Sequence, residues 1–236
     1  MDNGQAKLNL RVARICADAQ VLFDSPVRDE MWMLGLMRVV KESIILDLDY
    51  ESWSQSTYET WPYHKIRMCS SRSNASDDES SPTALGAPPH VYHDIWAALV
   101  WNQSRSCRIH LHEVLLHCLD LLHSHPDASN LSIDPQATRD QSKSTISDLV
   151  SDICDSVPFC IGDIDGNGKS RDAAKKIPLA GYLLLWPLYV ASISVDYGSP
   201  RHLWIREKLG YISRVMGIHK AQLLAMRPKK EPWDLS

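Results

Sequence analysis

The sequence lacks most of the local patterns that indicate a metal, a redox centre or secretion. Its six cysteines, at positions 16, 69, 107, 118, 154 and 160, never form a C-x-x-C pair. This spacing excludes a zinc ribbon, a local zinc cluster or a redox dithiol. The amino-terminal stretch MDNGQAKLNLRVARIC has no apolar signal core, so secretion is not expected. We therefore expect reduced thiols in an intracellular protein, located in the cytoplasm or the nucleus.

Positive charge is not in excess either. The 236 residues contain 25 Lys plus Arg against 29 Asp plus Glu, which gives a net charge of -4. This balance argues against a surface that binds nucleic acid directly. The one long apolar run, 177–195, is interrupted by Gly181 and Pro187. It predicts a buried helix with a proline kink, and no membrane span is expected.

The stretch GDIDGNGKSRDAA, residues 162–174, partly matches two ligand-binding loops and completes neither. Its first half resembles a calcium loop, but position nine is Arg171 and position twelve is Ala174 in place of the glutamate that binds the ion. A phosphate loop would need a glycine where Asp163 stands. The stretch therefore predicts a Gly-rich turn near 162–172.

Helical spacing of apolar residues is present wherever a pattern can be read, and no alternating strand of any length competes with it. The predicted fold is an all-α single domain over residues 1–236, built around one long central helix at 91–123. Segments near 69–89 and 124–143 are predicted to be mobile surface loops. The other predicted helices cover 8–23, 28–48, 146–154, the run after Ile177, 200–216 and 218–226.

The same spacing predicts which faces are buried. In the first helix the expected core positions are Leu8, Val12, Ile15, Ala19 and Leu22. In the second helix they are Met31, Leu34, Met37 or Arg38, Lys41 and Ile45. In the sixth they are Leu203, Leu209, Ile212 and Met216, and Gly217 is expected to cap that helix.

The central helix carries a polar stripe that has two interpretations. Asn102, Arg105 and His112 are spaced to share one face, and Arg108 lies four residues before His112. A structural network that fixes helix register is favoured for Arg108 and Glu113. Alternatively, the stripe lines an aromatic pocket in which a histidine moves a proton. The aromatic residues of that pocket would be Trp101, Tyr182, Trp186 and Tyr189.

The histidines of this helix do not have the spacing of a metal site. In HEVLLH, His112 and His117 are five residues apart, whereas a zinc-binding helix needs four. No serine elbow or dinucleotide fingerprint is present in the sequence. We therefore expect no metal and no cofactor.

Two stretches, 90–116 and 178–225, resemble the C-terminal half of the α-helical effector domain of fungal binuclear zinc-cluster transcription factors. In the second stretch LLWPLYVA, 184–191, and MGI, 216–218, match the family, and TWPYHK before the first loop also fits. The resemblance covers roughly residues 30–226 and implies the family's all-α fold. The matching positions of the central helix are Trp101, Asn102, Arg105, Arg108, Ile109, His112 and Glu113.

Three features distinguish this chain from the DNA-binding regulators of that family. It has no tight cluster of six cysteines and no basic region, so it is not expected to bind DNA in the family's way. The front portion of the family's domain is expected to be missing. His110 stands where the family usually has an aliphatic residue.

These observations give two hypotheses. The first is a stand-alone, transcription-factor-like protein that binds and converts a small apolar metabolite in fungal secondary metabolism, as a cofactor-free cyclase, isomerase or lyase. Its catalytic residues would be Arg105, His110 and His112, and its substrate-binding residues Trp101, Asn102, Tyr182, Trp186 and Tyr189. The second is a truncated transcriptional regulator or a partner-binding effector domain. We expect a small-molecule ligand or substrate, no direct nucleic acid, no membrane and a possible homodimer.

Overall fold

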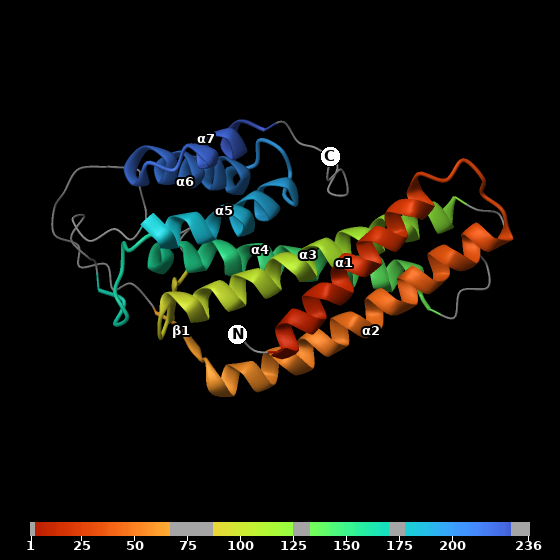
Figure 1. Cartoon of the computed structure of the whole chain (residues 1–236), viewed down its shortest axis with the longest axis horizontal. Coiled ribbons are helices and arrows are strands. Elements are labelled where there is room, and N and C mark those ends of the chain that lie inside the picture. Colours follow the sequence, from red (N-terminus) through yellow and green to blue (C-terminus); the bar gives the residue numbers. More distant parts are fainter. Residues whose placement is uncertain (1–2, 67–86, 125–132, 170–177, 228–236) are drawn as a thin grey trace. The chain divides into compact units, whose positions relative to one another are not determined.

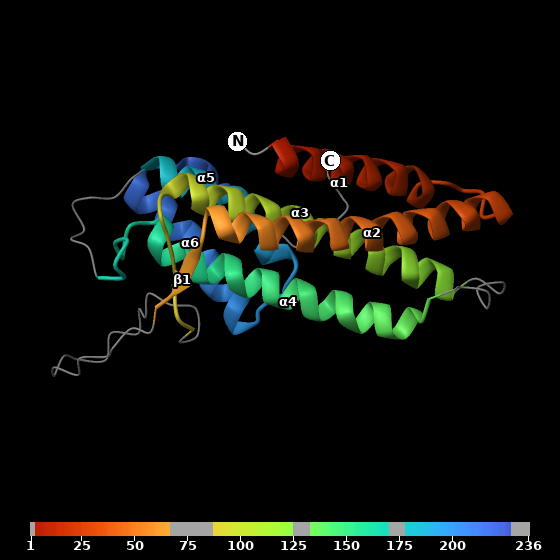
Figure 2. The same cartoon turned by 90° about the horizontal axis from the view of Figure 1, so that it is seen from below.

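The computed structural model describes residues 3–66, 87–124, 133–169 and 178–227 (Figures 1 and 2). Within these ranges the chain forms seven helices and one small antiparallel sheet, which confirms the all-α class. The elements are α1 (Asn3–Phe23), α2 (Glu30–Thr60), β1 (Tyr63–Lys65), β2 (His90–Tyr92), α3 (Ile95–His123), α4 (Pro135–Cys160), α5 (Pro178–Ile193), α6 (Pro200–Met216) and α7 (His219–Met226). No helix in the described part of the chain is long and apolar enough to cross a membrane.

The chain divides into two compact units, which we describe separately. The first contains residues 1–56 and 106–149, and the second contains residues 57–105 and 150–230. Helices α2, α3 and α4 therefore supply residues to both units. The single domain expected from the sequence stays a prediction.

In the first unit α1 and α2 lie side by side and run in opposite directions (Figures 1 and 2). Helix α1 buries Leu8, Val12, Ile15 and Ala19, as the spacing predicted, but Leu22 is only half-buried. The Trp32 ring nitrogen donates a hydrogen bond of 2.9 Å to the Leu22 carbonyl across the turn between the helices. The start of α2 is therefore held to the end of α1.

The predicted inner face of α2 is wrong. Met31 is 72% exposed, and Leu34 and Ile45 are also exposed. A second stripe with helical spacing faces inward instead, and its members are Trp32, Leu36, Val39, Leu46 and Tyr50. This stripe includes two large aromatic rings, so its burial removes more apolar surface from water.

The predicted loop at 124–143 is partly wrong, because α4 begins at Pro135. The Asp134 side chain accepts hydrogen bonds from the backbone N–H groups of Gln136 and Ala137, at 2.9 and 3.1 Å. An aspartate at the N-cap followed by proline at the first helical position is a strong helix start. Residues 125–132 of this predicted loop, like 69–86 of the earlier one, lie outside the described residues.

The Gly-rich stretch after α4 is a turn as far as the structure describes it, over residues 162–169. Gly162 and Gly168 have positive φ angles of 78° and 73°, which glycine adopts without strain. The Asp165 carboxylate accepts hydrogen bonds from the backbone N–H groups of Asn167 and Lys169. This carboxylate therefore stabilises the turn itself. Residues 170–172 of the predicted turn lie outside the described residues.

In the second unit α5, α6 and α7 pack against one another (Figure 1). Helix α6 begins at an N-cap, Ser199, and ends at Gly217, whose φ of 72° is the left-handed cap that the sequence predicted. Leu209 and Ile212 are buried as predicted, but Leu203 is exposed. The inward stripe of α6 starts one position earlier, at the buried His202.

The five cysteines within the described ranges are free thiols in buried or half-buried positions. Burial raises the pKa of Cys16 and Cys107 to about 11. It raises the pKa of Cys118, Cys154 and Cys160 to about 12. These thiols are therefore protonated at neutral pH.

Candidate functional site

The residues that the sequence singled out fall into three groups. Trp101, Asn102 and Arg105 lie together on α3 in the second unit. Tyr182, Trp186 and Tyr189 lie on α5 of that unit, while His110 and His112 belong to the first unit.

The first group is centred on the guanidinium of Arg105, whose side chain is only 4% exposed. It donates hydrogen bonds to the Tyr92 hydroxyl at 2.7 Å and to the side-chain Oδ1 of Asn102 at 2.9 Å. The rings of Tyr63, Tyr92 and Trp101 surround it, with centroids 5.1, 6.0 and 5.8 Å from the guanidinium carbon. Arg105 is thus held by hydrogen bonds and cation–π contacts at once.

The neighbours of Arg105 are themselves fixed by hydrogen bonds. The Asn102 amide donates to the Ser156 hydroxyl of α4 at 2.8 Å. The Trp101 ring nitrogen donates to the carbonyl of Trp61 at 3.0 Å. Trp101 and Asn102, which were predicted to bind a substrate, therefore form part of a packed polar core in this unit.

Asp152 of α4 is the acidic partner in this core. Its carboxylate lies 3.5 Å from the Arg105 guanidinium, 3.5 Å from the Lys65 ammonium and 3.6 Å from His90 Nε2. Burial alone would lower the pKa of Arg105, but Tyr92 and Asp152 outweigh burial and raise it above its ordinary value. Arg105 is therefore a fixed positive charge and cannot act as a proton donor.

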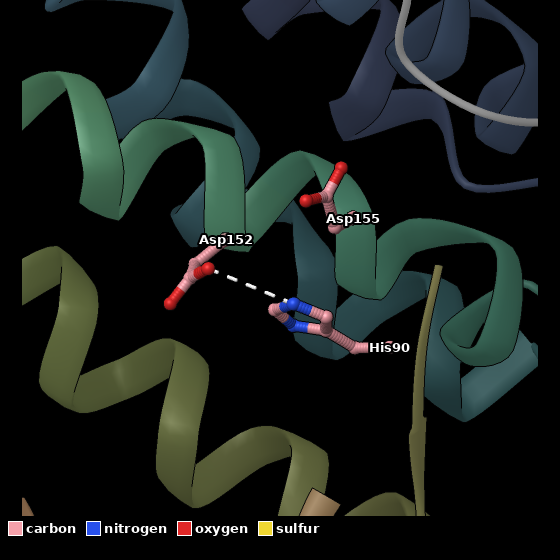
Figure 3. Close-up of side chains that lie close together, drawn as sticks. All are labelled: His90, Asp152 and Asp155. Atoms are coloured by element: carbon pink, nitrogen blue, oxygen red, sulfur yellow. Dashed lines mark ion pairs between the residues drawn. The ribbon is translucent and has the colours of Figure 1, made fainter. Parts of the chain in front are cut away.

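His90 of β2 faces Asp152 of α4, and Asp155 lies one turn further along the same helix (Figure 3). Burial, assisted by the charges of Arg105 and Lys65, lowers the pKa of His90 to about 2, so its imidazole is neutral. Burial and the nearby charge of Asp152 raise the pKa of Asp155 to about 6. One neutral imidazole and two carboxylates thus meet at one place.

The second group forms part of a pocket of about 520 Å³ in the second unit. Its lining residues are Tyr182, Leu185, Trp186 and Tyr189 of α5, Lys220, Leu223 and Leu224 of α7, and Arg227. Trp186 is 42% exposed, and its ring centroid lies 5.9 Å from that of Tyr189. The wall of the pocket is thus apolar and aromatic, and it is open to solvent.

Two cations flank this apolar wall. The Arg227 guanidinium lies 5.7 Å from the Tyr189 ring centroid and donates a hydrogen bond of 3.3 Å to the Tyr189 hydroxyl. Lys220 lies one turn before Leu223 and Leu224 on α7. No carboxylate or histidine is among the described lining residues.

The third group belongs to an ion-pair network in the first unit. Arg108 Nε donates a hydrogen bond of 2.8 Å to Asp47 Oδ1, and Arg108 Nη2 lies 2.7 Å from the same oxygen and 3.5 Å from Glu51. His112 Nε2 is 3.1 Å from the same Asp47 oxygen. His110 Nδ1 lies 3.6 Å from the Glu113 carboxylate. This geometry agrees with the structural interpretation of Arg108.

The neighbours of Asp47 favour the ionised form of its carboxylate. Burial alone would raise the pKa of Asp47, but the hydrogen bonds and charges of His112 and Arg108 outweigh burial and lower it below its ordinary value of 3.8. Asp47 is therefore held as a carboxylate beside Arg108, and His112 lies next to it.

Sequence reasoning did not single out His90, Asp152 and Asp155, nor Lys220 and Arg227 of the pocket. His90 is far from α4 in the sequence, and no local pattern connects it to Asp152 and Asp155. Those two aspartates stand three apart on one helix, a spacing that places them on one face. Lys220 and Arg227 are seven apart, which also places them on one face, next to the leucines of α7.

Comparison with known proteins gives one informative similarity. The chain is 29% identical over 211 residues to the protein named transcription factor dbaG of Emericella nidulans. The aligned part covers 86% of this chain and 46% of that protein, so the chain spans about half the length of this relative. No protein-family model matches the chain, and no solved structure matches it. The similarity supports a relationship to fungal transcription factors.

Proposed function

We propose that this chain is a transcription-factor-like regulatory module whose pocket between α5 and α7 binds a small apolar ligand that carries a negative charge. The observation that carries the proposal is this pocket, in a chain that is similar to a transcription factor along 86% of its length. The proposal follows the regulator hypothesis, and it keeps the small-molecule ligand of the first hypothesis. A location in the nucleus or the cytoplasm fits such a module.

The chemistry of the pocket supports an apolar anion. Its volume falls within the range of pockets that hold small organic ligands. Trp186, Tyr182 and Tyr189 offer flat apolar surfaces for an aromatic or similarly flat apolar ligand body. Lys220 and Arg227 supply positive charge at the edge, and no described lining residue balances it. A carboxylate or sulfonate on the ligand would therefore find complementary charge.

The predicted conversion of a metabolite is not part of this proposal. The three residues expected to catalyse it are absent from the described lining of the pocket. Arg105 and His112 are instead engaged with the carboxylates Asp152 and Asp47. Direct contact with DNA is not proposed either, because the chain's cysteines are not clustered and its net charge is -4. The homodimer expected from the sequence stays a prediction.

Replacement of Trp186 by alanine is expected to weaken the binding of an apolar anion about tenfold or more, because a large aromatic wall of the pocket is removed. The probe is 8-anilinonaphthalene-1-sulfonate, followed by its fluorescence. Trp96→Ala serves as the matched control, because Trp96 is exposed on α3 and does not line the pocket. Arg227→Gln should weaken binding of this anion severalfold, yet leave binding of uncharged N-phenyl-1-naphthylamine nearly unchanged. Equal binding in Trp186→Ala and Trp96→Ala would contradict the assignment of the pocket.

The regulatory part of the proposal is tested in cells with the same two variants. The full chain is joined to a heterologous DNA-binding domain, and expression of a reporter gene is measured with Trp186→Ala, Trp96→Ala and the unchanged chain. We expect Trp186→Ala to change reporter output while Trp96→Ala does not. If the binding of the probe is lost and reporter output stays the same, the pocket does not control transcription.

A further inference from the structure

A second site in the second unit is formed by His90, Asp152 and Asp155 (Figure 3). One ligand atom from each side chain lies within 4.8 Å of the other two. Asp152 and Asp155 stand one turn apart on α4, and His90 faces them from β2. Two carboxylates and an imidazole are ligand types that a zinc-class divalent cation accepts.

The buried Nε2 atom of His90, which has no hydrogen-bond partner among the described residues, is the observation that points to a ligand. Its side chain is completely buried, and its Nδ1 lies 3.3 Å from the Tyr92 hydroxyl. Among the described residues Nε2 has no hydrogen-bond partner, since the nearest carboxylate oxygen, on Asp152, is 3.6 Å away. When Nδ1–H donates to Tyr92, the lone pair of Nε2 faces Asp152, and a ligand atom of Asp155 lies within 4.8 Å. This is the arrangement in which a second-shell hydrogen bond orients a histidine for a metal.

The tyrosine is held in place as well. Its hydroxyl accepts a hydrogen bond of 2.7 Å from Arg105, whose guanidinium is fixed by Asn102. These contacts, from Arg105 through Tyr92 to His90, therefore hold the imidazole on the side of its Nδ1 atom. A cation would replace the long contact between His90 Nε2 and the Asp152 carboxylate with direct bonds to both groups.

Charge in the cluster leaves room for a cation. Arg105 is nearest to the second oxygen of Asp152, so the first oxygen can face a metal while this ion pair remains. Lys65 approaches the first oxygen at 3.5 Å, but its side chain is 53% exposed and can turn to solvent. Asp155 is 7% exposed and forms no ion pair with the described residues.

We propose that His90, Asp152 and Asp155 bind one divalent cation of the zinc class, with water in the remaining positions. The cation would tie the small sheet to α4. The site shares no residue with the ligand pocket, so either proposal can fail while the other stands.

The test is a calorimetric titration of Zn²⁺ into the full chain, freed of metal and kept reduced. We expect one equivalent to bind, with an affinity that falls about 100-fold or more in His90→Gln and in Asp155→Asn. His93→Gln is the matched control, because His93 lies three residues away and is exposed. Zn²⁺ should also raise the unfolding temperature of the unchanged chain but not that of Asp155→Asn.

A fourth variant tests the role of charge. Lys65→Gln removes a cation that competes for Asp152, so it should raise the affinity for Zn²⁺ about two- to fivefold. A purely structural role for the cluster does not predict a gain.

Cobalt distinguishes this site from one formed by the cysteines. Co²⁺ bound to nitrogen and oxygen gives only weak visible bands, whereas thiolate ligands add an intense charge-transfer band. Absence of Zn²⁺ binding, binding that is unchanged in the isosteric Asp155→Asn, or a thiolate band would each overturn the proposal. If His90→Gln does not fold, Asp155→Asn decides the question alone.

Discussion

Replacement of Arg105 by methionine is expected to lower the free energy of unfolding by about 3–5 kcal/mol, the cost of breaking a buried ion pair by removing one partner. The change leaves the Tyr92 hydroxyl and the side-chain Oδ1 of Asn102 without their shared donor, and it removes the ion-pair partner of Asp152. It also removes the cation that lies against the three rings of Tyr63, Tyr92 and Trp101. Arg105→Lys should recover only part of the loss, because an ammonium cannot donate in the same forked geometry.

The measurement is urea unfolding followed by circular dichroism. Arg38→Met is the matched control, because Arg38 forms an exposed ion pair with Asp18 at 3.4 Å. That variant should lose less than about 1 kcal/mol. In a double variant, Asp152→Asn should cost less when Arg105 has already been replaced. The account of this core is wrong if Arg105→Met costs no more than Arg38→Met.

Replacement of Asp47 by alanine is expected to cost about 3 kcal/mol of unfolding free energy at neutral pH. Asp47 balances Arg108 and lies 3.1 Å from His112, and the side chains of both these residues are nearly buried. Among the described residues, its removal leaves the Arg108 charge with only the longer contact to Glu51.

The pH dependence of this effect has a definite sign. Because the folded pKa of Asp47 is lowered below its ordinary value of 3.8, the ionised carboxylate contributes stability above that pH. The contribution is lost as the pH falls through the folded pKa. The difference in stability between the unchanged chain and Asp47→Asn should therefore shrink below about pH 4.

Urea unfolding at several pH values measures this difference. Asp49→Asn is the matched control, since Asp49 lies two residues further on α2 and pairs with Arg11 at the surface. Its cost should stay below about 1 kcal/mol at every pH. A constant difference for Asp47→Asn from neutral to acid pH would show that its charge does not matter.

Local sequence patterns predicted most of the helices. The spacing on α1 identified its core residues, and Gly217 marked the end of α6. On α2 two apolar stripes compete, and only packing decides between them, so the inner face was wrong. The start of α4 at Asp134 was not predicted, because the segment there is polar. Capping by the Asp134 side chain stabilises the helix start despite the low apolar content.

The candidate site was predictable only where its residues share one element. Tyr182, Trp186 and Tyr189 have helical spacing, so their common face on α5 follows from the sequence. The position of Lys220 and Arg227 next to these aromatic residues depends on how α7 packs against α5. The meeting of His90 with Asp152 depends on β2 and α4, which are far apart in the sequence, and no local pattern records it.

The protonated thiols give each unit its own reporter of local opening. Alkylating reagents attack the thiolate, so a cysteine whose pKa is about 11 or 12 reacts at neutral pH chiefly when its surroundings open. Cys16, Cys107 and Cys118 belong to the first unit, and Cys154 and Cys160 belong to the second. Mass-spectrometric detection of the labelled peptides thus separates the opening of one unit from that of the other, which a single denaturation curve averages.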